Sequence, residues 1–452
     1  MNNNTLDKNS LKIAVYVSLY LITIGIFLSI FFLTPNTSYD YPIIRSVIIF
    51  FCSILLVKYF FYMLISPWYD VYHAKIRSRS IEGKNKYEPL VSILIPAWNE
   101  SRGIVRTLET ILDSTYNKIE LVVINDGSTD DSNLCINEFI NKNKTEITKE
   151  SAIKIKYIYQ KNTGKGGALN KAIENSNGEI LITIDADCIV NKNTITNFVR
   201  HFEDQKVMAA VGNVKVAKAN NIISVIQQLE FLFSFYFKKA DSLMESIYII
   251  GGAAGAFRRE LFDEIGTFNT TNITEDIDIS VRIQKSGVKI VYASDAIVYT
   301  EGANDFTSLL KQRLRWKRGR FETFIKHREL FFSSDKKHKK ILSWIILPCA
   351  CLAEIQLSME LFFIIFLYVF SFLIHDFSSF IPGIAIVISM FVIQTIFDST
   401  EKKTWSFYLL APIGWLLFYA TTFIEVIALA KSISGLIMGK ELKWQKWKRV
   451  GI

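Results

Sequence analysis

The segment LITIDADC (residues 181–188) joins an apolar, β-branched run to two aspartates, and the predicted fold depends on how that junction is interpreted. The run predicts a buried strand. In an extended chain, residues i and i+2 point to the same side about 7 Å apart, so the carboxylates of Asp185 and Asp187 would project together. Two such charges repel unless a cation lies beside them. Taken alone, the segment favours a loop with a solvated aspartate pair. The neighbouring sequence must show whether the pair instead binds a cation.

Those surroundings alternate between strand-like and helix-like segments. Strands are predicted within VSILIPAWNE (91–100), IELVVINDGSTDDS (119–132), IKYIYQ (155–160) and GEILITIDADC (178–188), and helices within SRGIVRTLETILDS (101–114) and GGALNKAIENS (166–176). This alternation predicts an α/β domain whose mostly parallel sheet carries helices on both faces. Ligands bind such sheets at the carboxyl ends of the strands.

The chemically active groups follow those strand ends. Glu100 follows the first strand, Asp126 the second, and Lys165 with two glycines the third, while the aspartate pair follows the fourth. Independent surface polarity would scatter these groups, so they predict a site at one edge of the sheet. KNTGKGGALN (161–170) matches neither the phosphate-loop fingerprint nor the dinucleotide-binding fingerprint. It is a glycine-rich turn at a helix N-terminus, which could offer backbone N–H groups and the Lys165 cation to a phosphate.

Two later segments are distinctive. In TNITEDIDISVRIQKSG (271–287), Thr274 is predicted to cap a helix whose first turn holds Glu275, Asp276 and Asp278, which dipole compensation alone would also produce. KQRLRWKRGRFETFIKH (311–327) is basic and aromatic at helical spacing. Such a helix usually lies along a membrane surface with its aromatic residues inward and its Arg and Lys outward.

Composition indicates a membrane protein. Half of the 452 residues are hydrophobic, the mean hydropathy is +0.24, and runs near the length of a bilayer span are found at 11–33, 46–65, 352–374, 381–397 and 408–436. The first run is expected to be a retained helix and not a signal peptide. The five cysteines form no CxxC pair and no spacing with His that suggests zinc, and no disulfide framework is indicated.

The net charge of +9 is concentrated near the membrane segments, at residues 301–340 and in KELKWQKWKR (440–449). Basic residues beside spans mark the cytoplasmic side, and they can also hold anionic lipid or a phosphate-bearing substrate. No nucleic-acid partner is expected, because no DNA- or RNA-binding module accompanies the charge.

Five motifs occur in a fixed order: NDGS (125–128), GKGGALN (164–170), DAD (185–187), TED (274–276) and QRLRW (312–316). Together they resemble the processive family-2 glycosyltransferases, which include the cellulose, chitin, hyaluronan and poly-N-acetylglucosamine synthases. The resemblance spans about residues 90–320 plus the flanking apolar helices. GKGGALN, GNVKV (212–216) and AFRRE (256–260) are most similar to the bacterial poly-β-1,6-N-acetylglucosamine synthases.

The resemblance implies a GT-A domain that uses a UDP-sugar and inverts the anomeric centre. Asp126 would then contact uracil, Lys165 the diphosphate, and Asp185 and Asp187 the ribose, the phosphates and a divalent metal, Mg²⁺ or Mn²⁺. Asp276 would be the general base.

Further substrate contacts are implied for Glu100 and Glu275, and Gln312, Arg315 and Trp316 would hold the end of the growing glycan. Two departures from the family are Asn125, where many relatives carry Asp, and GGAAGA (251–256), which lacks the Cys or Ser of several synthases. The second leaves the identity of the acceptor open.

The predicted organisation is N-terminal transmembrane helices (1–66), a membrane-proximal linker (67–90), the GT-A domain (91–300), an amphipathic interfacial segment with QxxRW (301–340), C-terminal transmembrane helices (341–437) and a basic tail (438–452). A UDP-sugar donor places the GT-A domain in the cytoplasm of a multi-pass cell-membrane protein. Three C-terminal spans would leave the basic tail outside the cell, which contradicts the positive-inside rule. Two arrangements would avoid this: one stretch is re-entrant, or residues 341–351, which are expected to be interfacial, form a span of their own. Glu354 and Glu360 suggest a polar path between helices.

The favoured hypothesis is a processive synthase that polymerises and exports a β-linked glycan, with membrane lipid around it and room for a small accessory subunit. A hyaluronan- or cellulose-type polymer is an alternative product. Single transfer to a polyprenyl-phosphate or ceramide lipid shares most of the motifs, but QxxRW and helices on both sides favour polymerisation. A non-catalytic membrane scaffold is disfavoured because every expected acid is present.

Overall fold

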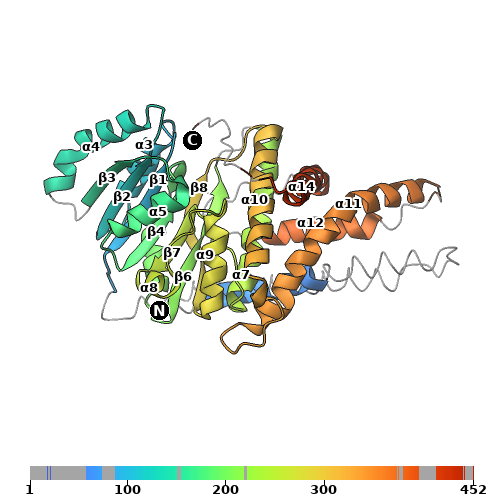
Figure 1. Ribbon diagram of the computed structural model, residues 1–452. Coiled ribbons are helices and arrows are strands. Elements are labelled where there is room, and N and C mark those ends of the chain that lie inside the picture. The colour runs from blue at the N-terminus through green and yellow to red at the C-terminus, as the bar shows by residue number, and fades with distance from the viewer. Residues whose placement is uncertain are drawn as a thin grey trace.

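The computed structural model describes residues 57–73, 87–149, 154–217, 221–373, 380–396 and 414–440, with a few isolated positions beside them. Its central feature is an eight-stranded sheet in the order β3-β2-β1-β4-β7-β6-β8-β5 (Figure 1). The strands are β1 (Val91–Ala97), β2 (Ile119–Asp126), β3 (Lys154–Gln160), β4 (Ile180–Ile184), β5 (Cys188–Val190), β6 (Val207–Val216), β7 (Ala254–Arg258) and β8 (Lys289–Thr300).

Helices cover both faces of the sheet because alternate residues of its central strands point to opposite sides. Ile93 and Ile95 of β1 pack in one core with α3, α4 and α6, whereas Leu94 packs in a second core with α5, α8 and α9. This confirms the predicted α/β layers. The helices are α3 (Ile104–Leu112), α4 (Ser132–Lys149), α5 (Gly164–Glu174), α6 (Thr194–His201), α7 (Ile222–Leu243), α8 (Glu260–Ile265) and α9 (Glu275–Ser286).

The sheet is parallel throughout its first half and mixed in its second half. Strands β3, β2, β1 and β4 are parallel neighbours, as predicted. Strand β7 is antiparallel to both β4 and β6, β5 is antiparallel to β8, and β6 and β8 are parallel to each other. The expectation of a mostly parallel sheet therefore holds from β3 to β4, whereas the second half is mixed. Here the chain between β6 and β7 is α7, which packs partly on β6 and partly on C-terminal helices, and β7 re-enters in the opposite direction.

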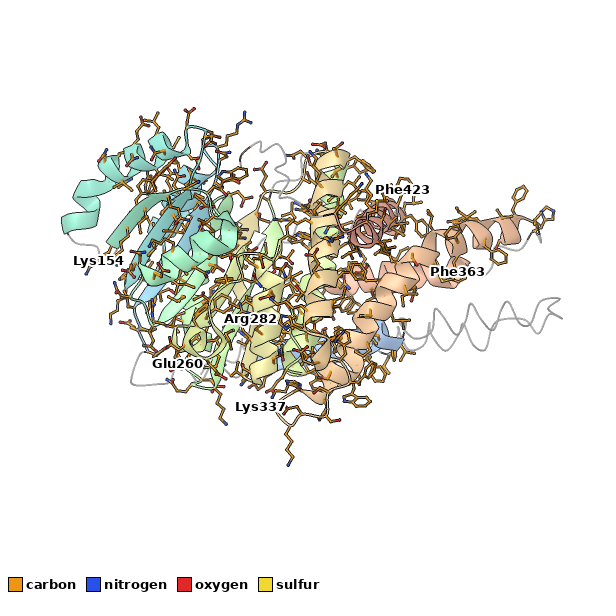
Figure 2. All side chains as sticks on the ribbon, viewed as in Figure 1. Lys154, Glu260, Arg282, Lys337, Phe363 and Phe423 are labelled. Atoms are coloured by element: carbon orange, nitrogen blue, oxygen red, sulfur yellow. The ribbon has the colours of Figure 1, made fainter. Side chains whose placement is uncertain are left out.

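Helix α10 (Phe306–Lys326) lies between the sheet domain and the C-terminal helices α11 (Leu347–Leu373), α12 (Phe380–Ile396) and α14 (Gly414–Ile437) (Figure 1). Two described stretches, Leu342–Phe363 and Tyr419–Ile437, are long and apolar enough to cross a membrane. Large apolar side chains of α11 are exposed, which is typical of a surface that meets another apolar phase; they are Ile355, Met359, Phe362, Ile365, Phe366, Val369, Phe372 and Leu373. Phe363 and Phe423 mark this part of the molecule, well away from the sheet (Figure 2).

Several predicted segments lie outside the described residues: the first N-terminal span, most of the second, most of the linker and nearly all of the basic tail. The expected interfacial stretch at 341–351 is described. A π-helical turn, Leu342–Ile346, continues directly into α11, and Leu342 packs with Ile277 and Val281 of α9. These residues therefore join α11 to the sheet domain.

The basic residues of α10 do not point outward as predicted. Arg313 and Lys317 are buried because acids on neighbouring helices pair with them. The Arg313 guanidinium contacts Glu230 of α7 and Glu425 of α14, and Lys317 Nζ lies 2.6 Å from Glu354 of α11 and 3.0 Å from Glu425. Glu354 also pairs with Arg320, at 2.7 Å. We call these six side chains the α10 ion-pair network; it gives Glu354 a partner on α10.

Gly319 allows α9 and α10 to meet closely. A Cβ at this position would lie 2.0 Å from Thr274 Oγ1 and 2.4 Å from its Cγ2, so any larger residue must push the start of α9 away from α10. We expect Gly319→Ala to lower the melting temperature despite its better helix propensity, because overpacking costs about 1–3 kcal/mol.

Thermal unfolding of the purified variants would test this prediction. Gly435→Ala in α14, where the added Cβ meets only Arg318 Nη1 at 3.4 Å, is the control and should be tolerated. The double variant Thr274→Gly/Gly319→Ala should recover part of the stability that Gly319→Ala loses. If the double variant were no more stable than Gly319→Ala, the steric explanation would be wrong.

Candidate active site

The aspartate pair sits on a rigid turn between β4 and β5. Helix α3 packs directly against this turn: a Cβ at Gly103 would lie 3.1 Å from Asp187 Cα, and Thr107 Oγ1 donates a hydrogen bond to Ala186 O at 2.9 Å. The Asp185 side chain is 29 % exposed, whereas Asp187 is 4 % exposed. One carboxylate therefore borders solvent, and the other lies beneath the surface of the turn.

Lys165, at the start of α5, joins this turn to the TED segment. Its Nζ lies 2.6 Å from Asp185 Oδ1 and 3.4 Å from Glu275 Oε1. Burial alone would lower the pKa of Lys165, but the charges of Asp185, Glu275 and Asp276 raise it overall. Gly252 leaves room for the ammonium group, because a Cβ there would lie 2.6 Å from Nζ. Lys165 is thus a fixed cation among three carboxylates.

Helix α9 begins with the TED segment. Asp276 is partly exposed, and its carboxylate accepts hydrogen bonds from Gly252 N (3.1 Å) and from Ile277 N (2.9 Å). The GGAAGA loop and the helix start therefore hold this carboxylate in place. Thr274 occupies the N-cap position as predicted, but its side chain makes no capping bond. Instead Thr274 Oγ1 donates to Asn272 Oδ1 at 3.2 Å, so the expected cap is wrong.

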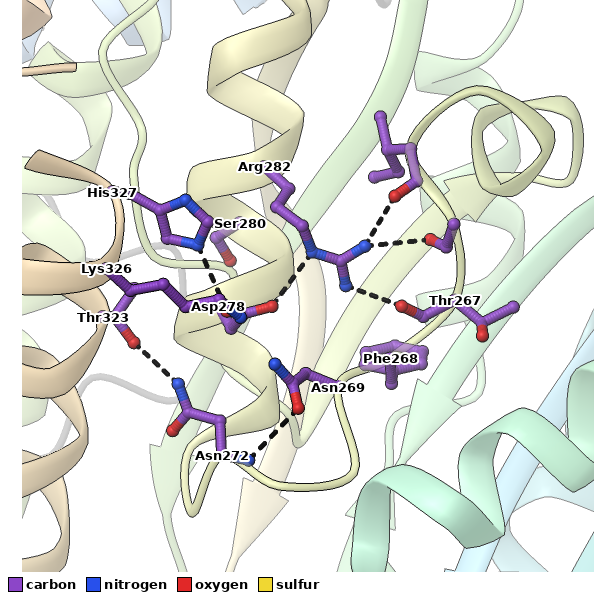
Figure 3. Close-up of polar contacts among 12 residues, drawn as sticks. Thr267, Phe268, Asn269, Asn272, Asp278, Ser280, Arg282, Thr323, Lys326 and His327 are labelled. Atoms are coloured by element: carbon purple, nitrogen blue, oxygen red, sulfur yellow. Dashed lines mark hydrogen bonds and ion pairs between the residues drawn. The ribbon is translucent and has the colours of Figure 1, made fainter. Parts of the chain in front are cut away.

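Asp278 lies outside the active site and belongs to a cluster of polar contacts that holds helices together (Figure 3). Its fully buried carboxylate lies 2.9 Å from Arg282 Nε, 2.7 Å from Lys326 Nζ and 3.2 Å from His327 Nε2. Burial alone would raise its pKa, but these partners hold the pKa of Asp278 well below its usual range. Arg282 also donates to three backbone carbonyls of residues 265–267, so the cluster ties α9 to both α10 and the loop after α8.

We expect Asp278→Asn to lower the melting temperature by several degrees, because removing one partner of a buried ion pair costs about 3–5 kcal/mol. Folding lowers the pKa of the Asp278 carboxyl. The carboxylate therefore stabilises the fold at pH values above its unfolded-state pKa of about 4, and this contribution is lost as the pH falls below that pKa. Melting curves between neutral and acidic pH should therefore show a smaller acid effect in the variant than in the wild type. Equal acid effects would contradict this role.

Glu100 and Asp126 lie in neighbouring turns of the same sheet edge. The Glu100 carbonyl accepts hydrogen bonds from Gly103 N and Ile104 N and so begins α3. The Asp126 carboxylate is 2 % exposed and accepts hydrogen bonds from Thr163 N and Gly164 N, both at 2.9 Å. It therefore holds the start of α5. The predicted uracil contact of Asp126 stays a prediction.

Arg315 of α10 belongs to the same charged group. Its positive charge, like that of Lys165, acts to lower the pKa of Glu275, but burial and the neighbouring Asp276 carboxylate raise that pKa overall. The charge of Arg315 therefore acts on the start of α9, although Arg315 and Glu275 are 40 residues apart in the sequence. Of the predicted residues, the structure brings together Lys165, Asp185, Glu275, Asp276 and Arg315.

Gln312 and Trp316 occupy adjoining turns of α10. Gln312 Oε1 is buried and accepts no hydrogen bond from the described residues, which is costly for an amide oxygen unless a ligand supplies the donor. The Trp316 ring is fixed by the Arg313 guanidinium, 4.4 Å from its centroid, and by the Phe231 ring at 6.5 Å. The two side chains thus offer an acceptor oxygen and a positioned aromatic ring.

Lys238 of α7 is a residue that the sequence motifs missed. Burial lowers its pKa to about 8, although the nearby charges of Asp241 and Asp276 act to raise it, and its Nζ donates to Ile249 O at 2.9 Å. A second cation therefore faces Asp276. No spacing pattern marks Lys238, which is one of several polar residues in α7.

Comparison with known proteins decides the family. The sequence matches the family described as Glycosyl transferase family 2 over residues 92–266, and Glycosyl transferase family group 2 over residues 180–423, more than half of the chain. The chain is a family-2 glycosyltransferase. The second match covers DAD, TED and QRLRW, and the enzyme is a hexosyltransferase.

Relatives of this glycosyltransferase support the narrower resemblance. It is 27 % identical to the poly-β-1,6-N-acetyl-D-glucosamine synthase of Staphylococcus epidermidis over 378 residues, which cover 80 % of this chain and 85 % of the relative. It is 30 % identical to the synthase of the same name from Staphylococcus aureus strain COL over 248 residues, covering 54 % and 57 %. The predicted likeness to these synthases is confirmed.

A solved structure supports the fold. A mannosyltransferase of Pyrobaculum calidifontis, in complex with GDP-Man and Mn²⁺, superimposes with a TM-score of 0.53 at 18 % identity and covers 86 % of this chain and all of its own. At that identity the likeness concerns the fold alone, and it confirms the predicted Rossmann-like α/β architecture of the glycosyltransferase.

The residues after β4 fit the divalent metal that this family implies. Asp185 and Asp187 provide hard oxygen donors on one rigid turn, and Mg²⁺ and Mn²⁺ prefer such donors and typically bind one or two carboxylates together with substrate phosphates. Lys165 Nζ lies 2.6 Å from Oδ1 of Asp185, and this carboxylate is 29 % exposed and borders solvent. The turn can therefore present carboxylate oxygen to an ion that a bound diphosphate also contacts.

Proposed function

We propose that this glycosyltransferase polymerises a β-linked glycan, poly-N-acetylglucosamine, from a UDP-sugar at the cytoplasmic face of a cell membrane, and exports the chain through its transmembrane helices. The named synthases among its relatives support the product, and the charged group around Lys165 supports the chemistry. The exposed apolar band of α11 supports the membrane location.

Asp276 has the geometry of the base. Its carboxylate is held by Gly252 N and Ile277 N while the side chain stays partly exposed, so it can accept the proton of an acceptor hydroxyl. As that proton leaves, the hydroxyl oxygen forms a bond to the anomeric carbon of the donor, and the bond from that carbon to the diphosphate oxygen breaks. UDP leaves with the bonding electrons, and the anomeric centre is inverted.

The leaving diphosphate develops negative charge, which the site can bind. Lys165 and Arg315 are the cations of the described group that would face it, and a metal ion held by Asp185 and Asp187 would supply further charge stabilisation there. Gln312 Oε1 can accept a hydrogen bond from a sugar hydroxyl, and the Trp316 ring offers a face on which a sugar can stack. These two groups would hold the end of the growing chain.

We expect Lys165→Met to weaken use of the donor by about 10–100-fold in kcat/KM, because a charge-assisted hydrogen bond contributes about 1.5–3 kcal/mol. The loss should fall mainly on the KM for the UDP-sugar, measured by UDP release. Lys171→Met in the same helix is the control, because Lys171 pairs only with Glu174 at the surface. An unchanged donor KM in Lys165→Met would contradict the diphosphate contact.

A panel of UDP-sugars tests the function. The full chain, purified in lipid nanodiscs, should convert UDP-N-acetylglucosamine into a polymer that an N-acetylglucosaminidase specific for β-linkages digests. A single sugar on each lipid would contradict processive synthesis and favour the lipid-acceptor alternative. A polymer formed only from UDP-glucose, or only with UDP-glucuronate present, would contradict the proposed sugar and indicate a cellulose- or hyaluronan-type product.

A further inference from the structure

Three titratable side chains from distant parts of the sequence meet away from the carboxylates of the active site. His73 is the last described residue of the helix over residues 57–73, His201 ends α6, and Asp295 lies in β8. The two histidine Nε2 atoms are 2.9 Å apart, and His201 Nε2 lies 3.7 Å from Asp295 Oδ1. One ligand atom from each of the three residues lies within 4.8 Å of the other two.

The cluster is buried and its rings are held in place. His73 and His201 are 5 % and 8 % exposed. The Tyr69 ring packs against His73 with centroids 5.2 Å apart, and the Tyr69 hydroxyl donates to the backbone carbonyl of Tyr292 in β8. Neither imidazole can therefore turn freely, and both present Nε2 to the same point.

Asp295 is oriented from its other side. Arg200 Nη1 lies 3.3 Å from Asp295 Oδ2, and Asn197 donates a hydrogen bond to the Asp295 backbone carbonyl at 2.7 Å. The guanidinium thus holds one carboxylate oxygen and turns the other, Oδ1, toward His201. A ligating carboxylate whose second oxygen is bound by a neighbouring group is a common feature of metal sites.

The geometry points to a transition-metal site, and we propose that it binds Zn²⁺ through His73 Nε2, His201 Nε2 and Asp295 Oδ1. With bonds of about 2.0–2.1 Å, tetrahedral zinc separates its ligand atoms by about 3.3 Å, and the observed separations of 2.9 and 3.7 Å lie on either side of this value. A hydrogen bond between two imidazoles would account for the first distance, but it gives no reason for a carboxylate at the same point. Imidazole nitrogen also selects zinc over Mg²⁺.

The site differs from the active site in chemistry and in position. Asp185 and Asp187 offer only oxygen and follow β4, whereas this cluster offers two nitrogens and joins β8 to the helix over residues 57–73. Residues 57–65 of that helix belong to the second predicted N-terminal span. Bound zinc would therefore fasten this helix to the sheet domain and would act on orientation, not on the transfer step.

Metal content of the full chain tests the proposal. Tag-free protein in nanodiscs is stripped with a chelator, incubated with Zn²⁺, and passed through a desalting column before elemental analysis. We expect about one zinc for each wild-type chain and at least about a 10-fold weaker affinity in His73→Gln and in Asp295→Asn. His338→Gln, which alters a histidine that contacts Ser333, and Asp185→Asn are the controls and should retain the zinc.

Cobalt provides a measurement that needs no variant. Co²⁺ added to the stripped wild-type chain should give the intense visible bands of a tetrahedral site with nitrogen ligands, and Zn²⁺ should displace them. Only weak bands of octahedral Co²⁺, or a zinc content equal to that of His73→Gln, would overturn the proposal and leave the two imidazoles as a hydrogen-bonded pair.

Discussion

Asp276→Asn should reduce glycan synthesis by about 10³-fold or more, because general-base catalysis contributes about 10²–10⁴-fold and an amide cannot take the proton. The substitution preserves the shape of the side chain and can keep the hydrogen bond from Gly252 N to its remaining carbonyl oxygen. Binding of UDP should therefore change little. The measurement is the rate of UDP release at saturating donor, together with the affinity for UDP from calorimetry.

The neighbours of Asp276 make this prediction specific. Lys165 and Lys238 place two positive charges near its carboxylate. Asp263→Asn, an exposed acid on α8, is the control and should keep the wild-type rate. Polymer formation by Asp276→Asn at the wild-type rate would show that another group accepts the proton.

The second large effect is expected at the turn between β4 and β5, where we propose that the metal binds. Asp187→Ala should lower metal-dependent turnover by about 10³-fold, because a Lewis-acidic ion supplies several kcal/mol of charge stabilisation at the leaving group. The test is a Mn²⁺ titration of UDP release, combined with electron paramagnetic resonance of Mn²⁺ in the presence of UDP. The variant should show weaker Mn²⁺ binding as well as lower activity.

Glu109→Gln is the matched control for that experiment, because Glu109 is an exposed acid on α3, the helix that packs against the same turn. It should leave the titration unchanged. If Asp185→Ala and Asp187→Ala both kept metal-dependent turnover, the turn would not be the metal site, although Asp276 could still be the base. The base assignment and the metal assignment can therefore be contradicted independently of each other.

The layers and the position of the site could be predicted from the sequence because they depend on local patterns. Period-two alternation in β1 sends Ile93 and Leu94 to opposite cores, and polar residues follow the strands whose carboxyl ends form one edge. Lys165 and Asp185 meet there for that reason. The order of the five motifs gave the family.

Features that depend on distant partners were not predictable in this way. The inward position of Arg313 and Lys317 depends on Glu230, Glu354 and Glu425. The separations along the chain are 83 residues for Glu230–Arg313 and 37 for Lys317–Glu354, and Glu425 lies on the last described helix. A basic amphipathic pattern alone cannot show whether a basic side chain faces water or pairs with a buried acid. The antiparallel β7 depends on the path of the chain through α7, and Lys238 carries no motif. No sequence motif links His73, His201 and Asp295, because tertiary packing alone brings these residues together.

The α10 ion-pair network limits how this enzyme can be divided. Lys317 and Arg320 of α10 take their partners from α11 and α14, so a fragment that stops before residue 341 would lose Glu354 and Glu425 while keeping the basic side chains. A fragment without the C-terminal helices, or a chimera carried on those of another family-2 glycosyltransferase, would need acids reinstalled opposite α10. The sheet domain and the C-terminal helices therefore have to be inherited, and engineered, as a single unit.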